Sequence, residues 1–157
     1  MNSERIDLLE RGDSFAPATA RMQWVGSANV PANSDVMIPV TALYEVTGQV
    51  FEHVPSAQAL RIKQSGVIGY TVNVVCSATG VGNINVLMRQ ASPLHEWPLV
   101  TQPYYLHASF AFFVGGARRV GIPSGGANYW VRVANTAGTG SFTLNIVDIF
   151  LVYLGRR

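Results

Sequence analysis

Charge is scarce in this sequence: 13% of its 157 residues are charged, and lysine occurs once, at Lys63. An average soluble domain has roughly 25% charged residues. The basic residues are scattered, and the only close pairs are Arg118-Arg119 and Arg156-Arg157. A surface that follows nucleic-acid phosphates needs clustered Lys and Arg, so we expect no nucleic-acid partner. A chain with so little charge to keep its copies apart is expected to use part of its surface as an interface.

Cysteine and targeting segments are also nearly absent. The single Cys76 lies in an alternating apolar stretch, which excludes an intramolecular disulfide and indicates a buried, unreactive thiol. The N-terminal residues include acids and no long apolar run, so they do not resemble a signal peptide. The apolar C-terminal run is too short and too interrupted to span a bilayer. We therefore expect synthesis in a cytoplasm and no membrane partner.

Catalytic motifs are missing as well. The three histidines, His53, His95 and His107, are far apart and lack metal-binding spacing, so we expect no metal site. The adjacent His95-Glu96 pair is better explained as ordinary polar residues of a loop than as an acid–base pair. Glycine pairs such as Gly115-Gly116 and Gly125-Gly126 are expected in hairpin turns, because no helix follows them to bind a phosphate. We expect no catalytic residue, no cofactor and no enzymatic activity.

Residues 1–34 differ in composition from the rest and are expected to form an N-terminal arm. Four of the nine acids lie in the first thirteen residues, and Ser3 could cap a short helix from Glu4 to Arg11. The following small residues around Pro17 indicate an extended segment. Phe15 and Trp24 are either packed on their own domain or inserted into a partner.

Residues 35–157 have the pattern of a single β-sandwich domain. About eight strands are expected at roughly ten-residue spacing, which is typical of a sandwich or barrel. They fall at 36–40, 43–51, 59–63, 67–76, 83–89 and 106–114 and in two strands within 127–154. Three prolines, Pro93, Pro98 and Pro103, interrupt the chain from Ala91 onward and predict a long irregular loop there.

The segment Ala127–Leu154 is the most informative part of the chain. Two apolar runs flank the turn-prone residues 135–140, which predicts an antiparallel hairpin. The first run alternates, with Tyr129, Val131 and Val133 on one face. The second run alternates through Phe142, Leu144 and Ile146 and is then apolar on both faces, so it needs a cover on both sides. Asp148 interrupts it and requires a cationic partner, either Arg132 or an arginine of a neighbouring subunit.

The arm, the short strands, the closing segment YWVRVANTAGTGSFTLNIVDIFLVYLG and the low charge resemble small jelly-roll proteins of tailed bacteriophages. These include capsid decoration (cement) proteins and tumour-necrosis-factor-like knobs of tail fibres. The likeness is one of pattern over residues 36–155. It implies an all-β, antiparallel jelly-roll sandwich and a homotrimer on the virion surface whose partner is the major capsid protein. No coiled coil or fibre repeat precedes the domain, which favours the cement protein over the fibre knob.

The resemblance also implies roles for particular residues. Arm residues that would contact the capsid are Ile6, Leu9, Phe15 and Trp24. Residues of the terminal hairpin that would form the subunit interface are Tyr129, Ile149, Leu151 and Tyr153.

Two alternatives remain open. In a receptor-binding knob, the segment 93–103 with His95, Trp97 and Tyr104 would hold a glycan or another cell-surface receptor against aromatic faces. A small jelly-roll coat protein is the other alternative. It needs a basic arm to neutralise a packaged genome, and this arm is acidic.

Overall fold

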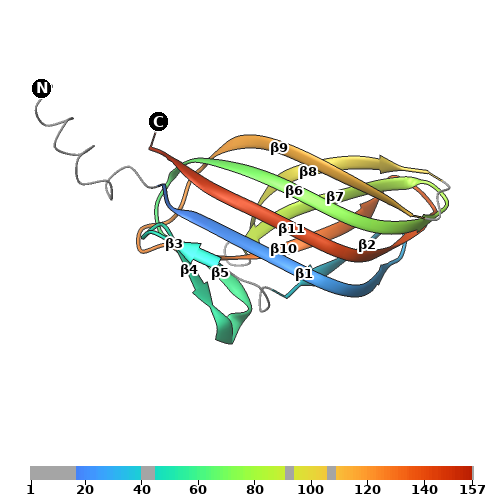
Figure 1. Ribbon diagram of the computed structural model, residues 1–157, viewed down its shortest axis with the longest axis horizontal. Helices are drawn as coiled ribbons and strands as arrows, with labels where there is room; N and C mark the ends of the chain where they lie inside the picture. Colours follow the sequence, from blue (N-terminus) through green and yellow to red (C-terminus); the bar gives the residue numbers. More distant parts are fainter. Residues whose placement is uncertain (1–16, 40–44, 91–93, 106–108, 157) are drawn as a thin grey trace, which may run out of the picture.

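The computed structural model describes residues 17–39, 45–90, 94–105 and 109–156, and these form an all-β jelly-roll sandwich of two antiparallel sheets (Figure 1). The five-stranded sheet has the order β3-β1-β11-β6-β9. Its strands are β1 (Thr19–Val30), β3 (Glu45–Thr47), β6 (Gly66–Thr79), β9 (Phe110–Val120) and β11 (Ser141–Gly155). Figure 1 shows β1, β11 and β6 running side by side along the long axis.

The six-stranded sheet has the order β4-β5-β10-β7-β8, and β2 pairs with β10 on the side opposite β7. Its strands are β2 (Ser34–Ile38), β4 (Phe51–Val54), β5 (Ala59–Ile62), β7 (Gly82–Gln90), β8 (His95–Tyr104) and β10 (Ala127–Thr136). A short 3₁₀ turn, Pro55–Ala57, joins β4 to β5.

The core lies between the two sheets and follows the alternation of the sequence. In β10, Tyr129, Val131 and Val133 are buried, whereas Trp130 and Arg132 are half-buried on the other face, as the sequence predicts. Cys76 is buried in the same core, and this burial raises the pKa of its thiol to about 12. A thiol that stays protonated is a poor nucleophile, which agrees with the unreactive cysteine expected from the sequence.

Strands β10 and β11 do not form the expected hairpin. β10 belongs to the six-stranded sheet and β11 to the five-stranded sheet, so the segment between them crosses the sandwich. The β6–β7 connection crosses at the same end, and the two connections meet where Gly140 N donates to the carbonyl oxygen of Val81 at 3.1 Å. A turn-prone sequence marks where the chain reverses but not which sheet it enters.

A change of register in β11 corrects a second expectation. The pairing with β6 shifts between Leu144 and Ile146, so the extra residue Asn145 forms a β-bulge. Ile146 therefore lies on the outer face instead of sharing the inner face with Leu144. Beyond the bulge, Val147 begins a new buried series.

The predicted arm contains a strand of the sandwich. β1 lies between β3 and β11 and pairs with β11 along most of its length. The apolar side chains Ala20 and Met22 are buried in the core. The boundary between arm and domain therefore precedes Thr19 and does not lie at residue 34. The short helix predicted for residues 4–11 lies outside the described residues.

Prolines and glycines explain two further differences. Residues 95–104 form strand β8, although Pro98 and Pro103 predicted a loop. β8 is an edge strand, and a proline can occupy an edge because no neighbour needs its missing N–H. Gly115 and Gly116 lie within β9, where the sequence predicted a turn.

The buried amide of Asn135 joins the two sheets where the connections cross. Its Nδ2 donates to the carbonyl oxygens of Val30 at 3.0 Å and Gly140 at 2.9 Å, and its Oδ1 accepts from the Tyr104 hydroxyl at 2.8 Å. Val30 ends β1 in one sheet, whereas Asn135 and Tyr104 belong to the other. Asn135 therefore satisfies three groups that have little access to water.

Asn135→Ala should lower the free energy of unfolding by about 3 kcal/mol, because three buried polar groups lose their partner. Urea denaturation monitored by tryptophan fluorescence measures this loss. Asn83→Ala, at a half-buried position in the neighbouring strand β7, serves as the control and should change stability by about 0.5 kcal/mol or less. Equal effects of the two substitutions would contradict the role assigned to Asn135.

Candidate subunit interface

The candidate site is the outer face of the five-stranded sheet, which turns away from the core. Its side chains follow from strand register and lie in rows that cross β1, β11, β6 and β9. From one end of the sandwich, the rows are Val25-Ile146-Val75-Ala111, Gln23-Asp148-Asn73-Phe113, Arg21-Phe150-Thr71-Gly115 and Thr19-Val152-Gly69-Ala117. We call this surface the outer face of the five-stranded sheet.

Large apolar side chains are exposed on this face. The exposed fraction is 68% for Phe113, 63% for Val25 and 56% for Leu154, and Phe150 is 38% exposed. These residues come from three strands but share one surface. Polar side chains such as Gln23, Asn73 and Thr71 lie between them. Single exposed apolar residues are common, but several on one sheet face are typical of a protein interaction site.

The outer face of the six-stranded sheet differs, because a network of charged side chains lies on it beside one exposed large apolar side chain, Met37. Asp35 binds Arg132 at 2.7 Å and Arg89 at 3.0 Å, and Arg89 also binds Glu96 at 2.7 Å. The hydrogen bond from Arg132, together with the positive charge of Arg89, holds the pKa of the Asp35 carboxyl below its usual range although burial opposes this. This network pairs four charged side chains of that face within one chain.

One ion pair lies within the apolar face. Arg21 makes a two-pronged contact with Asp148, at 3.0 Å and 3.3 Å, and this hydrogen bonding raises the pKa of the Arg21 guanidinium. The sequence suggested Arg132 as the partner of Asp148, but Arg132 lies on the other sheet and binds Asp35. A covered face would therefore bury a pair whose charges already neutralise each other.

Three of the four predicted interface residues lie inside the chain's own sandwich. Tyr129, Ile149 and Leu151 are fully buried, which leaves these side chains no surface to offer a second subunit. Burial raises the pKa of the Tyr129 hydroxyl, which donates to Gln90 Oε1 at 3.0 Å. An apolar strand does not itself show which of its faces lies inward. Tyr153 is half-buried, and its hydroxyl donates to the carbonyl oxygen of Ser65, so its interface role stays a prediction.

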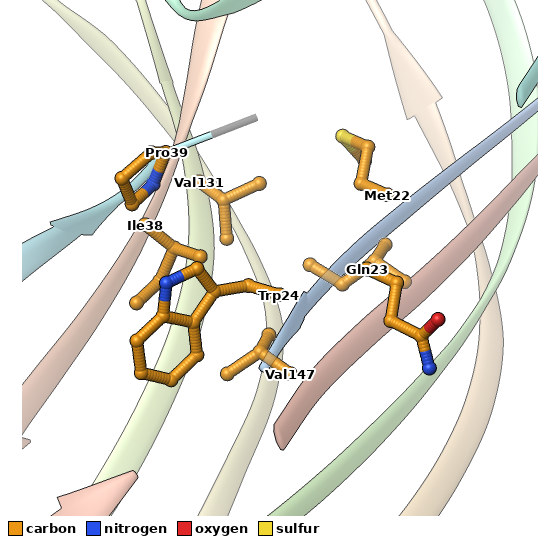
Figure 2. Close-up of a pocket in the computed structure, with 8 residues that line it drawn as sticks. Met22, Gln23, Trp24, Ile38, Pro39, Val131 and Val147 are labelled. Atoms are coloured by element: carbon orange, nitrogen blue, oxygen red, sulfur yellow. The ribbon is translucent and has the colours of Figure 1, made fainter. Parts of the chain in front are cut away.

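Of the four predicted capsid-contact residues, the structure describes Trp24. Its indole packs against its own domain, at an opening between the sheets lined by Met22, Ile38 and Val131 (Figure 2). The free volume there is about 10 Å³, close to the lower limit for one water molecule. The structure therefore favours packing on the own domain for Trp24. Ile6, Leu9 and Phe15 lie outside the described residues.

The exposed residues Val25, Phe113, Phe150 and Leu154 are absent from the predicted interface. A sequence signal existed, since β11 is apolar at successive positions and Phe112-Phe113 places one ring on each face of β9. The sequence does not show which residue of such a neighbouring pair faces solvent; that depends on the register of β11 and of β9 in the sheet.

The described residues contain no group of three or more His, Cys, Asp or Glu side chains arranged to bind a metal ion. Within the same residues, no helix is long and apolar enough to cross a membrane.

Comparison with known proteins identifies the fold. No protein-family model and no curated protein sequence matches the chain. Among solved structures, the chain is similar to Eiger TNF from S. frugiperda, with a TM-score of 0.59 and 14% identity over 90% of this chain and 96% of that one. It is also similar to murine APRIL, with a TM-score of 0.58 and 11% identity over 88% and 100% of the two chains. The PRD1 vertex protein P5 matches with a TM-score of 0.51 and 14% identity over 88% and 97%. These similarities show a tumour-necrosis-factor-like jelly roll.

Replacing Asp35 by Asn should lower the free energy of unfolding by about 1–2 kcal/mol at pH 7. The reason is that the half-buried side chains of Arg89 and Arg132 lose the carboxylate that both of them bind. The folded-state pKa of Asp35 is depressed, so its stabilisation is full above about pH 4 and is lost as pH falls through the folded-state pKa. The difference between wild type and variant should therefore be smaller at pH 3 than at pH 7. Urea denaturation at both pH values measures it, and a difference that does not shrink at pH 3 would contradict the assignment. Glu52→Gln, which breaks an exposed pair with Lys63, is the control and should cost about 0.5 kcal/mol or less.

Proposed function

We propose that this protein is a structural virion protein that assembles into a homotrimer on the surface of a virus shell. The observation that carries the proposal is the set of exposed large apolar side chains on the outer face of the five-stranded sheet, while the opposite outer face carries a network of ion pairs. This asymmetry supports self-association through one face while the other stays in water. The number of subunits follows from the likeness to tumour-necrosis-factor-like knobs.

The place on a virion is supported by the fold shared with the PRD1 vertex protein P5 and by the low charge of the chain. Within this class we favour a capsid decoration protein that binds the major capsid protein and stabilises the assembled shell. A ligand that binds only the assembled shell opposes disassembly by mass action, and several linked contacts raise the overall affinity.

Residues 1–16 are the proposed attachment to the shell. The start of β1 pairs with the end of β11, because Thr19 lies opposite Val152. The N-terminal residues therefore leave the sandwich at the end where the chain also finishes. The sandwich would then extend outward from the shell, with the crossing connections at its far end.

A receptor-binding knob is the second candidate, and it is favoured by exposed side chains at the far end. Tyr105 is 60% exposed and Val81 46% exposed near the crossing connections. The glycan site expected from the sequence is not available, because Trp97 and Tyr104 are buried in the core. A receptor would have to bind these far-end residues instead.

Phe113→Asp should disrupt self-association while leaving the monomer folded, because an unpaired carboxylate would be buried in the subunit contact. We expect the association constant to fall at least about 100-fold. Light scattering after size exclusion measures the mass, which should be a multiple of the 17.0 kDa chain mass for the wild type and a single chain mass for the variant. Circular dichroism checks the fold.

Leu94→Asp is the matched control, because Leu94 is 70% exposed, similar to Phe113, but precedes β8 on the other sheet. It should keep the wild-type mass. A monomeric wild type, or an assembled Phe113→Asp variant, would disprove assembly through this face. A stable assembly of two subunits would correct the proposed trimer.

Deleting residues 1–16 should abolish binding to purified shells without changing the mass of the assembly. The deletion stops before Thr19, because β1 is an internal strand whose loss would expose the core. Co-sedimentation with shells measures binding, and cryo-electron microscopy locates the bound protein. Unchanged shell binding would exclude residues 1–16 as the attachment, and binding to host cells in place of shells would favour the receptor knob.

A further inference from the structure

A polar hollow lies at the end of the sandwich where the β1–β2, β6–β7 and β10–β11 connections pass between the sheets. The residues that line it are Asn33, Ser34, Asp35, Ala134, Asn135 and Thr136. It is open to solvent and has a volume of about 390 Å³, within the usual range of about 300–1,000 Å³ for small-molecule sites. Its lining comes from β2, β10 and the turns beside them, so it is separate from the candidate subunit interface on the other sheet.

The small side chain of Ala134 leaves space for this hollow. Ala134 is half-buried on the outer face of β10, where its register partners are Asp35 on β2 and Asn85 on β7. A methyl group between two longer polar side chains leaves a depression in this row. A larger side chain at position 134 would therefore fill the hollow without removing any of its polar groups.

The β10 side of the hollow presents a hydrogen-bond donor. Thr101 Oγ1 donates to Asn85 Oδ1 at 2.6 Å, and Asn85 Nδ2 donates to Thr136 Oγ1 at 2.6 Å. A hydroxyl group has one hydrogen to donate and two lone pairs that accept. Because the Thr136 oxygen accepts the bond from Asn85, its own hydrogen is left to donate to a ligand. The chain of hydrogen bonds also fixes the position of this hydroxyl.

The β2 side of the hollow supplies an amide and a carboxylate. Asn33 has an exposed side chain and a left-handed backbone, with a φ of 58°. Its amide both donates and accepts hydrogen bonds. The Asp35 carboxylate binds Arg132 at 2.7 Å and Arg89 at 3.0 Å, so its charge is compensated while its oxygens keep lone pairs for a further bond. This side therefore accepts as well as donates.

The lining favours a neutral ligand that is rich in hydroxyl groups. Among the described residues that line the hollow, none is basic and none is aromatic. A phosphate or sulfate group binds best to cationic donors, and a flat aromatic ligand needs an apolar wall, so neither fits this lining. Each hydroxyl of a sugar both donates and accepts hydrogen bonds. Neighbouring sugar hydroxyls therefore match a wall made of a hydroxyl, an amide and a carboxylate.

We propose that this hollow binds a neutral sugar unit of a glycan through the side chains of Asn33, Asp35 and Thr136. The Thr136 hydroxyl donates to a sugar oxygen, the Asp35 carboxylate accepts from a sugar hydroxyl, and the Asn33 amide does both. The contacts are few and open to solvent, so the Kd for a single sugar is on the order of 1 mM. Glycan binding goes beyond assembly and shell attachment and depends on neither. Several hollows in one assembly would raise the affinity for a glycan with repeated units.

Saturation-transfer difference NMR with the methyl glycosides of glucose, galactose and mannose tests the site on the full-length protein. We expect at least one of these sugars to bind the wild type. Thr136→Val keeps the side-chain volume but removes the donor, and Asn33→Gly removes the amide at a backbone conformation that glycine adopts readily. Each of these two changes should weaken binding about fivefold. Ala134→Leu fills the hollow and should abolish binding.

Thr143→Val is the matched control, because Thr143 lies toward the same end of the sandwich but on β11 in the other sheet, in register with Asn29 and Ser77. It should bind the sugars as the wild type does. Failure of all three glycosides to bind the wild type would overturn the proposal, and so would unchanged binding by the Thr136 and Asn33 variants. Binding of the anionic sugar N-acetylneuraminic acid alone would overturn the neutral class of ligand. Circular dichroism checks the fold of each variant, and light scattering reports assembly separately from sugar binding.

Discussion

Strand β11 has apolar side chains on both faces, and a strand of this kind must be covered on both sides. The six-stranded sheet covers one side, where Val147, Ile149 and Leu151 are buried. The other side carries Phe150 and Leu154 into solvent within a single chain. Because β11 is the middle strand of its sheet, its uncovered side lies at the middle of an apolar surface. The inner face of β11 thus contributes to the core, and its outer face contributes to the candidate interface.

Local pattern predicted the fold class and the inner face of most strands, since alternation of apolar residues depends only on neighbours in sequence. It did not predict which strands share a sheet. Residues 135–140 carry the turn signal of a hairpin, yet the chain crosses between sheets there, and the decisive contacts come from Val30, Tyr104 and Val81, which are distant in sequence. The prolines in residues 95–104 predicted a loop, but these residues form the edge strand β8. The sequence of a segment does not show whether the segment lies at the edge of a sheet, where proline is tolerated.

The candidate interface was predictable in kind but not in its residues. The low charge and the apolar terminal strand indicated an interface that includes β11, the strand at the middle of the candidate face. Selecting Ile149 and Leu151 instead of Phe150 and Leu154 depended on which face is inward, and the bulge at Asn145 reverses that face partway along β11. Phe113 needed further information, since its exposure depends on the register of β9 against β6.

The subunit contact argued for this protein is mainly apolar, so it should respond to solution conditions in one direction. Burial of apolar side chains such as Phe113 and Leu154 is not weakened by salt, and salting-out anions strengthen it. Arg21 and Asp148 lie on the same face and already pair with each other, so covering the face buries no uncompensated charge. An assembly through this face should therefore persist at high ionic strength.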